Sequence, residues 1–488
     1  MQPAARRREA VRLHRINPGA SEHRELIMNI QRWGLVLLLG WTQLAWSAPD
    51  KVDAFLRAEM ARNHIPGAAV AVVRDGKVIK LAAYGTANLE WKAPASTRTA
   101  FQIASGTKMF TAVLLMDFVG QGKLKLDARV CQYIPDCPPA WKDITLLHLA
   151  SHTSGLRPGP VDADNASVTV AIDAAKKAPL ASAPGEKNAY GSDDFVLLTH
   201  VLEKAGGAPY EQLLRDRIFT PLGMTNSGFD HATLTEAHVV LTSDVVTERA
   251  ATYQWRTGHQ QQYWFMYPRY TLSAGGLFSS VTDMSRFAAA LMGDKLLNAD
   301  LRSAMWTPPT LNDGKPSSFA VGWTVGQYRG RHEVAHSGGP ALSDTVIYPA
   351  DKLAVVVLTN QRRLSPSLAH GVAKLFLSPP PFLNEPGITD AAPERTVALK
   401  ALLPALLAGN ADARHFTGTA KDSLADLNEW LPIALGGLPP MSRLILLEDS
   451  ADHLSRTYRA IHGKDQTLRW AVRFDEAGRI SEVEPRDE

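Results

Sequence analysis

Cysteine is scarce in this sequence, and the patterns of two large enzyme classes are missing from it. Only Cys131 and Cys137 occur among 488 residues, and no histidine stands beside them, which argues against a metal site there. The chain contains no P-loop and no G-x-S-x-G. These absences argue against P-loop nucleotide-binding proteins and hydrolases with a nucleophile elbow, and we expect no metal or organic cofactor.

An excess of positive charge is also missing beyond the first part of the chain. The formal net charge is +3, and seven arginines against three glutamates precede residue 48. The remainder is therefore close to neutral and has no field that would attract a phosphate backbone. It also lacks the interleaved aromatic and basic residues of nucleic-acid-binding surfaces, so we expect no nucleic-acid partner.

Long apolar runs are missing as well. The apolar stretch at residues 33–46 is shorter than the ~20 residues that a helix needs to cross a membrane. It ends in Ala45-Trp46-Ser47, which has the small residues of a signal-peptidase site. We therefore expect residues 1–47 to be a signal peptide cleaved near Ser47 or Ala48, a periplasmic or secreted protein, and no stable membrane span.

The leader is longer than a signal peptide requires. Signal peptides normally begin close to their charged region, so Met28 is the expected true start. A long arginine-rich extension with a processing role is the alternative. In an oxidising compartment the two cysteines could close a small loop, which the chain-entropy model credits with roughly 2–3 kcal/mol.

The hydrophobic patterns predict an α+β fold. Residues 52–64 read as a helix, and 68–74 and 78–85 as strands joined by Asp75-Gly76, a strong hairpin signal. Residues 333–339, 344–350 and 353–360 read as further antiparallel strands. The region between these blocks is mainly helical in period, including 108–119, 193–205 and 283–293. One antiparallel sheet built from both ends, flanked by helices and carrying a helical subdomain, explains this order.

A change in composition near residue 379 predicts a domain boundary. Proline is concentrated at 379–396 without any period, which indicates a linker. The main domain then spans 48–378. Beyond the linker, 397–488 contains two helical patterns and four short alternating segments, which predict a small C-terminal α+β module.

The first chemical motif is Ser105-Gly106-Thr107-Lys108, the one S-x-x-K in the chain. Residues three apart at a helix start share one face, so the lysine amine can approach the serine hydroxyl. A desolvated lysine with a lowered pKa can take the proton that makes serine a nucleophile. The motif alone is weak, because a helix cap followed by a surface lysine explains it equally well.

The surrounding passage FQIASGTKMFTAVLLM resembles the nucleophile helix of the serine β-lactamase and penicillin-binding-protein superfamily. The resemblance extends over about residues 50–378 and implies the β-lactamase/transpeptidase-like fold. In PGEKNAYGSDDF, Tyr190 matches the tyrosine that shares the base role, with its pKa lowered by the nearby ammonium. Ser192 matches a polar residue, more often asparagine, that contacts the substrate amide or the lysine.

A third match is His336-Ser337-Gly338-Gly339. In the superfamily this strand edge runs along the substrate and begins with lysine in K-T-G or histidine in H-x-G. No K-T-G occurs here, so His336 takes that place. By this correspondence the glycines permit close backbone approach, and the N–H groups of Gly339 and Ser105 form the oxyanion hole.

The resemblance implies acyl transfer. Ser105 attacks a carbonyl, Lys108 with Tyr190 carries the proton to the leaving group, and water completes hydrolysis. Expected substrates are small amides or esters, including peptidoglycan-derived ones, as for D-alanyl-D-alanine carboxypeptidases, D-amidases and carboxylesterases. A β-lactamase and a non-catalytic receptor for cell-wall fragments or a protein are the alternatives.

Two further expectations concern the surroundings of the site. Residues 156–168 and the aromatic segment 252–270 are expected to shape its mouth, with Trp255 and Trp264 lining an acyl or aryl pocket. His152 is expected to be structural. The oligomeric state is left open.

Overall fold

The computed structural model describes residues 50–488 except 160, 162–166, 231–232, 236–239, 243–244, 266, 340, 363–366 and 436. The predicted signal peptide, its cleavage site and the alternative start all lie outside the described residues, as does part of the segment 156–168. These features remain predictions.

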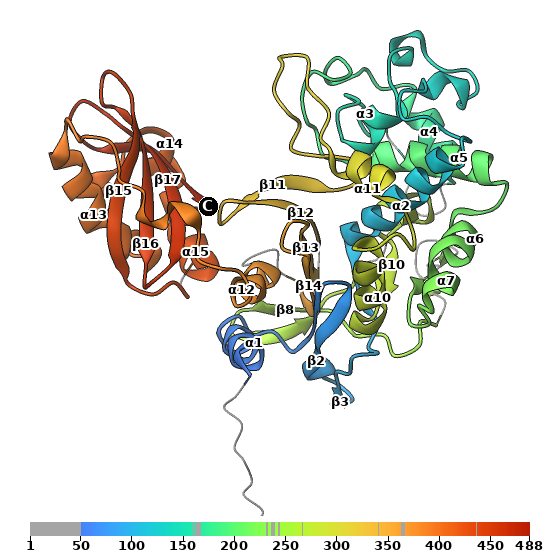
Figure 1. The fold of residues 1–488 in the computed structure, drawn as a ribbon, viewed down its shortest axis with the longest axis horizontal. Helices are drawn as coiled ribbons and strands as arrows, with labels where there is room; N and C mark the ends of the chain where they lie inside the picture. Colours follow the sequence, from blue (N-terminus) through green and yellow to red (C-terminus); the bar gives the residue numbers. More distant parts are fainter. Residues whose placement is uncertain are drawn as a thin grey trace, which may run out of the picture. The chain divides into compact units, whose positions relative to one another are not determined.

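The main element of the fold is a mostly antiparallel sheet built from both ends of the predicted main domain (Figure 1). It combines the two blocks of strands that the sequence predicted. Its strands are, in spatial order, β11 (Thr324–Tyr328), β12 (Arg331–Gly338), β13 (Ala341–Tyr348), β14 (Leu353–Arg362), β1 (Gly67–Arg74), β2 (Lys77–Asn88) and β3 (Ala93–Pro94). A short hairpin, β8 (Tyr253–Arg256) and β9 (His259–Gln262), joins the sheet through a parallel pairing of β8 with β14.

The central strand β1 explains why the sheet is covered on both faces. Its apolar residues are almost continuous, which is typical of a strand buried on both sides. Ala68, Val70 and Val72 belong to one core, and the alternate residues of β1 belong to another. β1 joins β2 through Asp75 and Gly76, which both have positive φ, as the predicted two-residue hairpin requires.

Helices cover each face of the sheet. α1 (Lys51–Arg62) and α12 (Leu368–Lys374) contribute Leu56 and Val372 to the core on one face. α2 (Thr107–Gly120) and α10 (Val281–Leu291) contribute to the larger core on the other face. The expected helices at 52–64, 108–119, 193–205 and 283–293 are confirmed within one or two residues at most ends.

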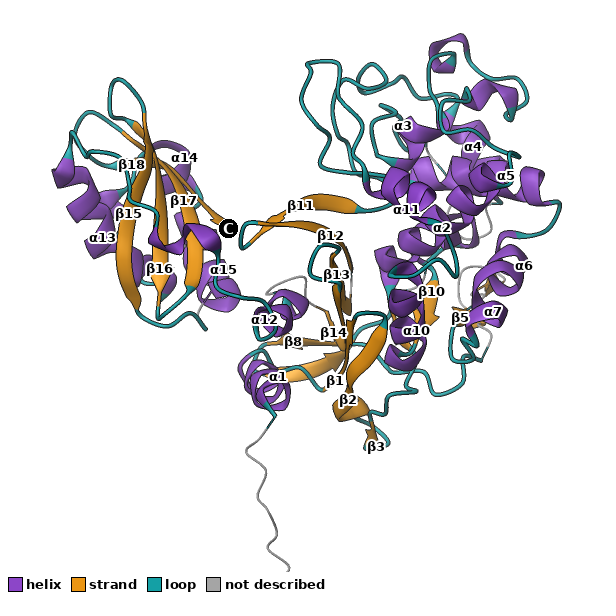
Figure 2. Ribbon diagram, in the orientation of Figure 1, coloured by secondary structure: helices purple, strands orange, loops and turns teal. Residues whose placement is uncertain are grey.

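The remaining helices of this region form the predicted helical subdomain (Figure 2). They are α3 (Leu146–Ala150), α4 (Val168–Ala175), α5 (Asp193–Gly206), α6 (Tyr210–Leu214), α7 (Thr220–Leu222), α9 (Leu272–Gly275) and α11 (Ala299–Trp306). Two small sheets accompany them: β4 (Phe101–Gln102) with β10 (Leu277–Ser279) and β5 (Gly228–Phe229), and β6 (Thr233–Thr235) with β7 (Val240–Thr242).

The C-terminal residues form the predicted α+β module. Its antiparallel sheet has the order β15 (Met441–Asp449), β16 (Ser455–His462), β17 (Gln466–Phe474) and β18 (Ile480–Asp487). α13 (Pro393–Leu407), α14 (Gly418–Asp422) and α15 (Leu424–Leu435) supply the other half of its core. The core is separate from the two cores of the main sheet.

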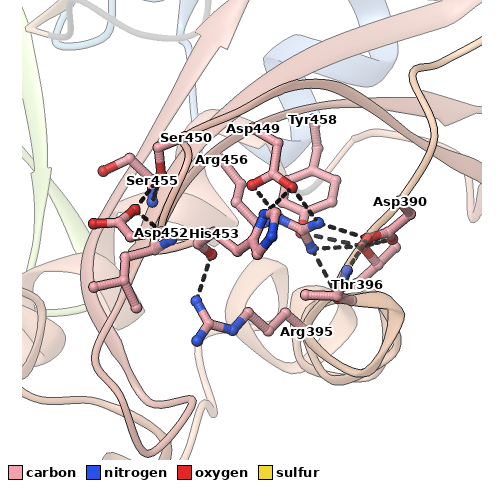
Figure 3. A network of polar contacts seen from close by, with 12 residues as sticks. Asp390, Arg395, Thr396, Asp449, Ser450, Asp452, His453, Ser455, Arg456 and Tyr458 are labelled. Atoms are coloured by element: carbon pink, nitrogen blue, oxygen red, sulfur yellow. Dashed lines mark hydrogen bonds and ion pairs between the residues drawn. The ribbon is translucent and has the colours of Figure 1, made fainter.

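A buried arginine attaches the predicted linker to this module (Figure 3). The Arg456 side chain is fully buried and donates hydrogen bonds to Asp449 and to Asp390, which lies within residues 379–396. It also donates to the carbonyl of Ala392 and to the Tyr458 hydroxyl. Charge-assisted hydrogen bonds therefore join the end of the linker to the module.

Cys131 and Cys137 form a disulfide, as the loop length allows. Within the described part of the chain, no helix combines the length and apolarity that a membrane crossing needs.

Candidate active site

Ser105 lies in a short 3₁₀ turn, Ala104–Gly106, directly before α2. Ala104 has φ +50°, a conformation that is costly for a residue with a side chain. The turn is held by a hydrogen bond from the Ile103 amide to the Leu277 carbonyl, and by one from the Ser343 hydroxyl to the Ile103 carbonyl. The backbone that presents Ser105 is therefore fixed by two strands, β10 and β13.

Lys108 lies beneath the serine, as the S-x-x-K spacing predicts. Its Nζ is 3.5 Å from Ser105 Oγ and donates to the carbonyl of Ala274 at 2.6 Å. The side chain is only 1% exposed. Burial lowers the pKa of Lys108 to about 7, against an opposing effect of the Asp194 carboxylate. A substantial fraction of this amine is therefore neutral near pH 7 and able to accept a proton.

Tyr190 is the second predicted proton carrier, and it does converge on the serine. Its hydroxyl lies near enough to Ser105 to interact with it. Its ring centroid lies 4.9 Å from Lys108 Nζ. The predicted lowering of its pKa is wrong: burial raises the pKa of Tyr190, and the interaction with Ser105 only partly opposes this. The structure therefore favours Lys108 as the base and leaves Tyr190 as a protonated partner.

Ser192 lies at the start of α5, and its expected contact with a substrate amide stays a prediction. It is the N-cap residue of α5, but its side chain does not cap the helix. The hydrogen bonds of the Lys108 amine go to Ser105 and Ala274 instead. Sequence reasoning missed Ala274, because a backbone carbonyl carries no signal in the residue type.

His336 lies on β12, two residues before its end, and is buried. Its Nδ1 donates to the carbonyl of Ser337 at 2.8 Å. Burial and the positive charge of Lys108 lower the pKa of His336 to about 3. The imidazole is therefore neutral at physiological pH and cannot supply the charge of the lysine that it replaces.

The two glycines after Ser337 bring β12 against the nucleophile. A Cβ on Gly338 would overlap the carbonyl oxygen of Ile103. Gly339 follows directly, beyond the last register pair of Gly338 with Ser343. The predicted close approach of this strand edge to Ser105 is therefore present.

The letters of a zinc-protease motif, H-E-x-x-H, occur in β12 as His332 to His336. In that motif a helix brings the two histidines together. On an extended strand they are about 13 Å apart. Glu333 is also engaged by the Tyr348 hydroxyl and by His370. Across the described residues, no three His, Cys, Asp or Glu side chains are grouped to hold a metal.

A buried histidine and aspartate lie behind Tyr190. His152 Nδ1 is 2.9 Å from Asp194 Oδ2, and Ser154 donates to the same carboxylate. The His152 ring packs 4.5 Å from the Tyr190 ring. This arrangement agrees with the structural role expected of His152, because it supports the tyrosine.

The aromatic segment 252–270 contributes a residue that the sequence did not single out. The Tyr267 hydroxyl donates to the carbonyl of Gly339 at 2.9 Å and also interacts with Ser105. Trp255 stacks on His64 with ring centroids 3.8 Å apart, which gives it a packing partner within the fold. Trp264 is 68% exposed, so its proposed place in a pocket stays a prediction.

Comparison with known proteins gives the family. The family model described as Beta-lactamase matches residues 52–375. A penicillin-binding protein of Bacillus subtilis (strain 168) is 26% identical over 317 residues, which cover 62% of this chain and 70% of that protein. A D-aminopeptidase of Gluconobacter oxydans (strain 621H) is 26% identical over 323 residues, which cover 64% and 58%. The chain spans less than two thirds of the length of this D-aminopeptidase and of some other curated relatives that it matches.

Solved structures agree on the fold. The octameric penicillin-binding protein homologue from Pyrococcus abyssi aligns with a TM-score of 0.60 at 21% identity. The alignment covers 90% of this chain and 98% of that one. The family match, the fold and the relatives agree that this chain belongs to the beta-lactamase family, among the serine hydrolases related to penicillin-binding proteins.

Proposed function

We propose that this protein is an exported serine hydrolase that cleaves small amide or ester substrates through an acyl-enzyme at Ser105. The observation that carries the proposal is the buried Lys108 amine, 3.5 Å from Ser105 Oγ, with its pKa lowered to about 7. A neutral amine at this distance can take the serine proton as the hydroxyl attacks a carbonyl.

The other groups divide the remaining steps. The Tyr190 hydroxyl, which interacts with Ser105, passes the proton toward the leaving group. The amides of Ser105 and Gly339 hold the oxyanion, a contribution of about 3–4 kcal/mol per donor. Water then attacks the acyl-enzyme while the same groups act in reverse.

The state of His336 supports substrates without a carboxylate at this position. Penicillins and D-alanyl peptides end in a carboxylate, which a lysine would attract. His336 is neutral, since burial holds its pKa at about 3. A neutral ester or amide loses nothing by this replacement, so we favour a carboxylesterase-like or amidase-like activity over a β-lactamase.

Export is supported by two features of the chain. The apolar leader and the small residues before Ala48 have the form of a signal peptide. The disulfide between Cys131 and Cys137 suits an oxidising compartment such as the periplasm or the medium.

Covalent labelling tests the proposal. Purified protein is incubated with a fluorescent penicillin and, separately, with a nitrophenyl ester, beside Ser105→Ala and the control Ser303→Ala. Ser303 is exposed on α11, so its substitution leaves the site intact. We expect turnover or labelling in the wild type and in Ser303→Ala and none in Ser105→Ala. Equal labelling and turnover in Ser105→Ala and the wild type would contradict the proposal. That result would favour the alternative of a non-catalytic receptor for cell-wall fragments or a protein.

A substrate panel then tests the preference. Nitrophenyl esters, a D-alanyl anilide and a chromogenic cephalosporin are compared by kcat/KM. We expect the neutral ester or amide to exceed the cephalosporin by at least about 100-fold, since about 3 kcal/mol separates a paired from an unpaired carboxylate. A preference for the cephalosporin would overturn the assignment of substrate class while leaving the nucleophile in place.

A further inference from the structure

Two tyrosine hydroxyls, not one, interact with Ser105. Tyr190 comes from the predicted second motif, whereas Tyr267 comes from the aromatic segment after β9. The Tyr267 hydroxyl donates to the Gly339 carbonyl at 2.9 Å and interacts with Ser105. The Tyr190 ring lies over the Lys108 amine. The Tyr267 hydroxyl instead bonds Gly339, the residue directly after β12.

The fold makes room for the Tyr267 ring at one glycine. A Cβ on Gly275 would overlap this ring. Gly275 ends α9 and follows Ala274, whose carbonyl accepts the hydrogen bond of Lys108. The same turn of backbone therefore holds the lysine and leaves the space that the second tyrosine fills. The Phe265 ring packs against Tyr267 edge to face, at 4.9 Å between centroids.

Gly339 needs a support of this kind. The ladder between β12 and β13 has its last pair before it, at Gly338 and Ser343. Glycine has no side chain to restrict its backbone, so a residue beyond a ladder is free to rotate unless something holds it. The Tyr267 hydroxyl binds the carbonyl of Gly339. This bond restricts the backbone of Gly339, whose amide must face the substrate.

We propose that Tyr267 is a positioning residue for acyl transfer at Ser105, fixing the Gly339 end of β12 beside the nucleophile through its hydroxyl. The inference rests on the proposed function, since it assigns the Gly339 amide to the oxyanion. Oxyanion stabilisation depends on donors held within a few tenths of an ångström, and a misplacement of 1 Å can cost about 100-fold in rate. Burial raises the pKa of Tyr267, so the hydroxyl stays a donor across the working pH range.

The direct test is Tyr267→Phe, which removes the hydroxyl and keeps the ring. We expect kcat for a nitrophenyl ester to fall about 10- to 100-fold, with KM changed less than about threefold. The midpoint of the pH profile should not move, because Lys108 is untouched. Tyr133→Phe is the control: it removes a tyrosine hydroxyl outside segment 252–270, directly after the 3₁₀ turn Val130–Gln132, and should keep the wild-type kcat. The burst of nitrophenol counts competent sites, so kcat refers to folded protein only.

A double-mutant cycle gives a second readout. Gly275→Ala should lower kcat in the wild type, because the new methyl group displaces the Tyr267 ring. In Tyr267→Ala the ring is absent, and Gly275→Ala should then change kcat by less than about twofold. If Gly275→Ala lowered kcat by the same factor in the wild type and in Tyr267→Ala, the proposal would be overturned. A wild-type kcat in Tyr267→Phe would also overturn it.

The two proposals fail in different ways. Activity that survives Ser105→Ala would remove the acyl-enzyme and with it the role of Tyr267. Activity that depends on Ser105 but not on the Tyr267 hydroxyl would remove the positioning role alone.

Discussion

At the residue scale, burial decides what the site can do. A lysine in water is protonated near pH 7, whereas Lys108 is 1% exposed and has its pKa lowered to about 7. The same desolvation raises the pKa of Tyr190 and lowers that of His336. Burial therefore disfavours the charged form of each group, which leaves a neutral amine on Lys108, a protonated hydroxyl on Tyr190 and an uncharged imidazole on His336.

The pH dependence of the reaction follows from the pKa of Lys108. Below about pH 7 the amine is protonated and cannot accept the serine proton, so kcat/KM should rise with pH and level off above about 8. Measurement of kcat/KM from pH 5 to 9 on a neutral ester would show this profile.

Lys108→Arg provides the companion experiment. A guanidinium stays charged over the whole range, so kcat/KM should fall by at least about 10³-fold at every pH. Lys123→Arg, an exposed lysine after α2, should behave as the wild type. A wild-type profile that is flat or falls between pH 6 and 8 would contradict the assignment of Lys108 as the base.

At the element scale, the site depends on how closely β12 approaches the start of α2. Gly338 has no side chain where a Cβ would overlap the Ile103 carbonyl. Ser343 of the neighbouring strand β13 bonds the same carbonyl at 2.7 Å. The nucleophile turn and the strand edge are therefore one packed unit, although more than 200 residues separate them in the chain.

Gly338→Ala tests this approach. The methyl group must push β12 away from the Ser105 turn, so kcat/KM should fall by at least about 100-fold. Gly326→Ala is the matched control, because Gly326 lies in β11 of the same sheet and a Cβ there meets nothing within 4 Å. Assays of both variants on one ester, with circular dichroism to follow folding, would decide the point. A Gly338→Ala protein with normal activity would contradict the close packing.

At the scale of the whole molecule, the chain builds separate cores. Two lie on the faces of the main sheet, and a third belongs to the C-terminal module. Arg456 contributes to the third by joining the linker residue Asp390 to β15 (Figure 3). A buried arginine that has carboxylate partners leaves unpaired charge behind when it is removed.

Arg456→Met should destabilise the module by about 3–5 kcal/mol. Arg473→Met, which replaces an exposed arginine on β17 that bonds Ser455 at 3.2 Å, should change stability by less than about 1 kcal/mol. Thermal unfolding would measure both, and an ester assay would follow the site. We expect Arg456→Met to keep its activity below the unfolding transition, because none of its contacts reaches Ser105. Equal stabilities of the two variants would contradict the structural role of this network.

Much of the fold could be predicted from local pattern. Alternation and apolar runs indicated the strands of the main sheet, the main helices and the module, because these depend on residue spacing that the chain itself carries. S-x-x-K placed Lys108 correctly, since three residues at a helix start share a face. The predicted contact of Ser192 stays a prediction, whereas the predicted pKa of Tyr190 was wrong, because it depends on neighbours contributed by distant segments.

The amino-acid sequence by itself determined the order of elements, the S-x-x-K spacing of Ser105 and Lys108, the family and the near-neutral charge of the chain beyond residue 47. Only the tertiary structure decided the protonation of Lys108 and His336, the support of Lys108 by Ala274 and the arrival of Tyr267 at Gly339. The physical reason is that burial and backbone hydrogen bonds arise between segments far apart in the chain. Neither leaves a mark on the local pattern of residues.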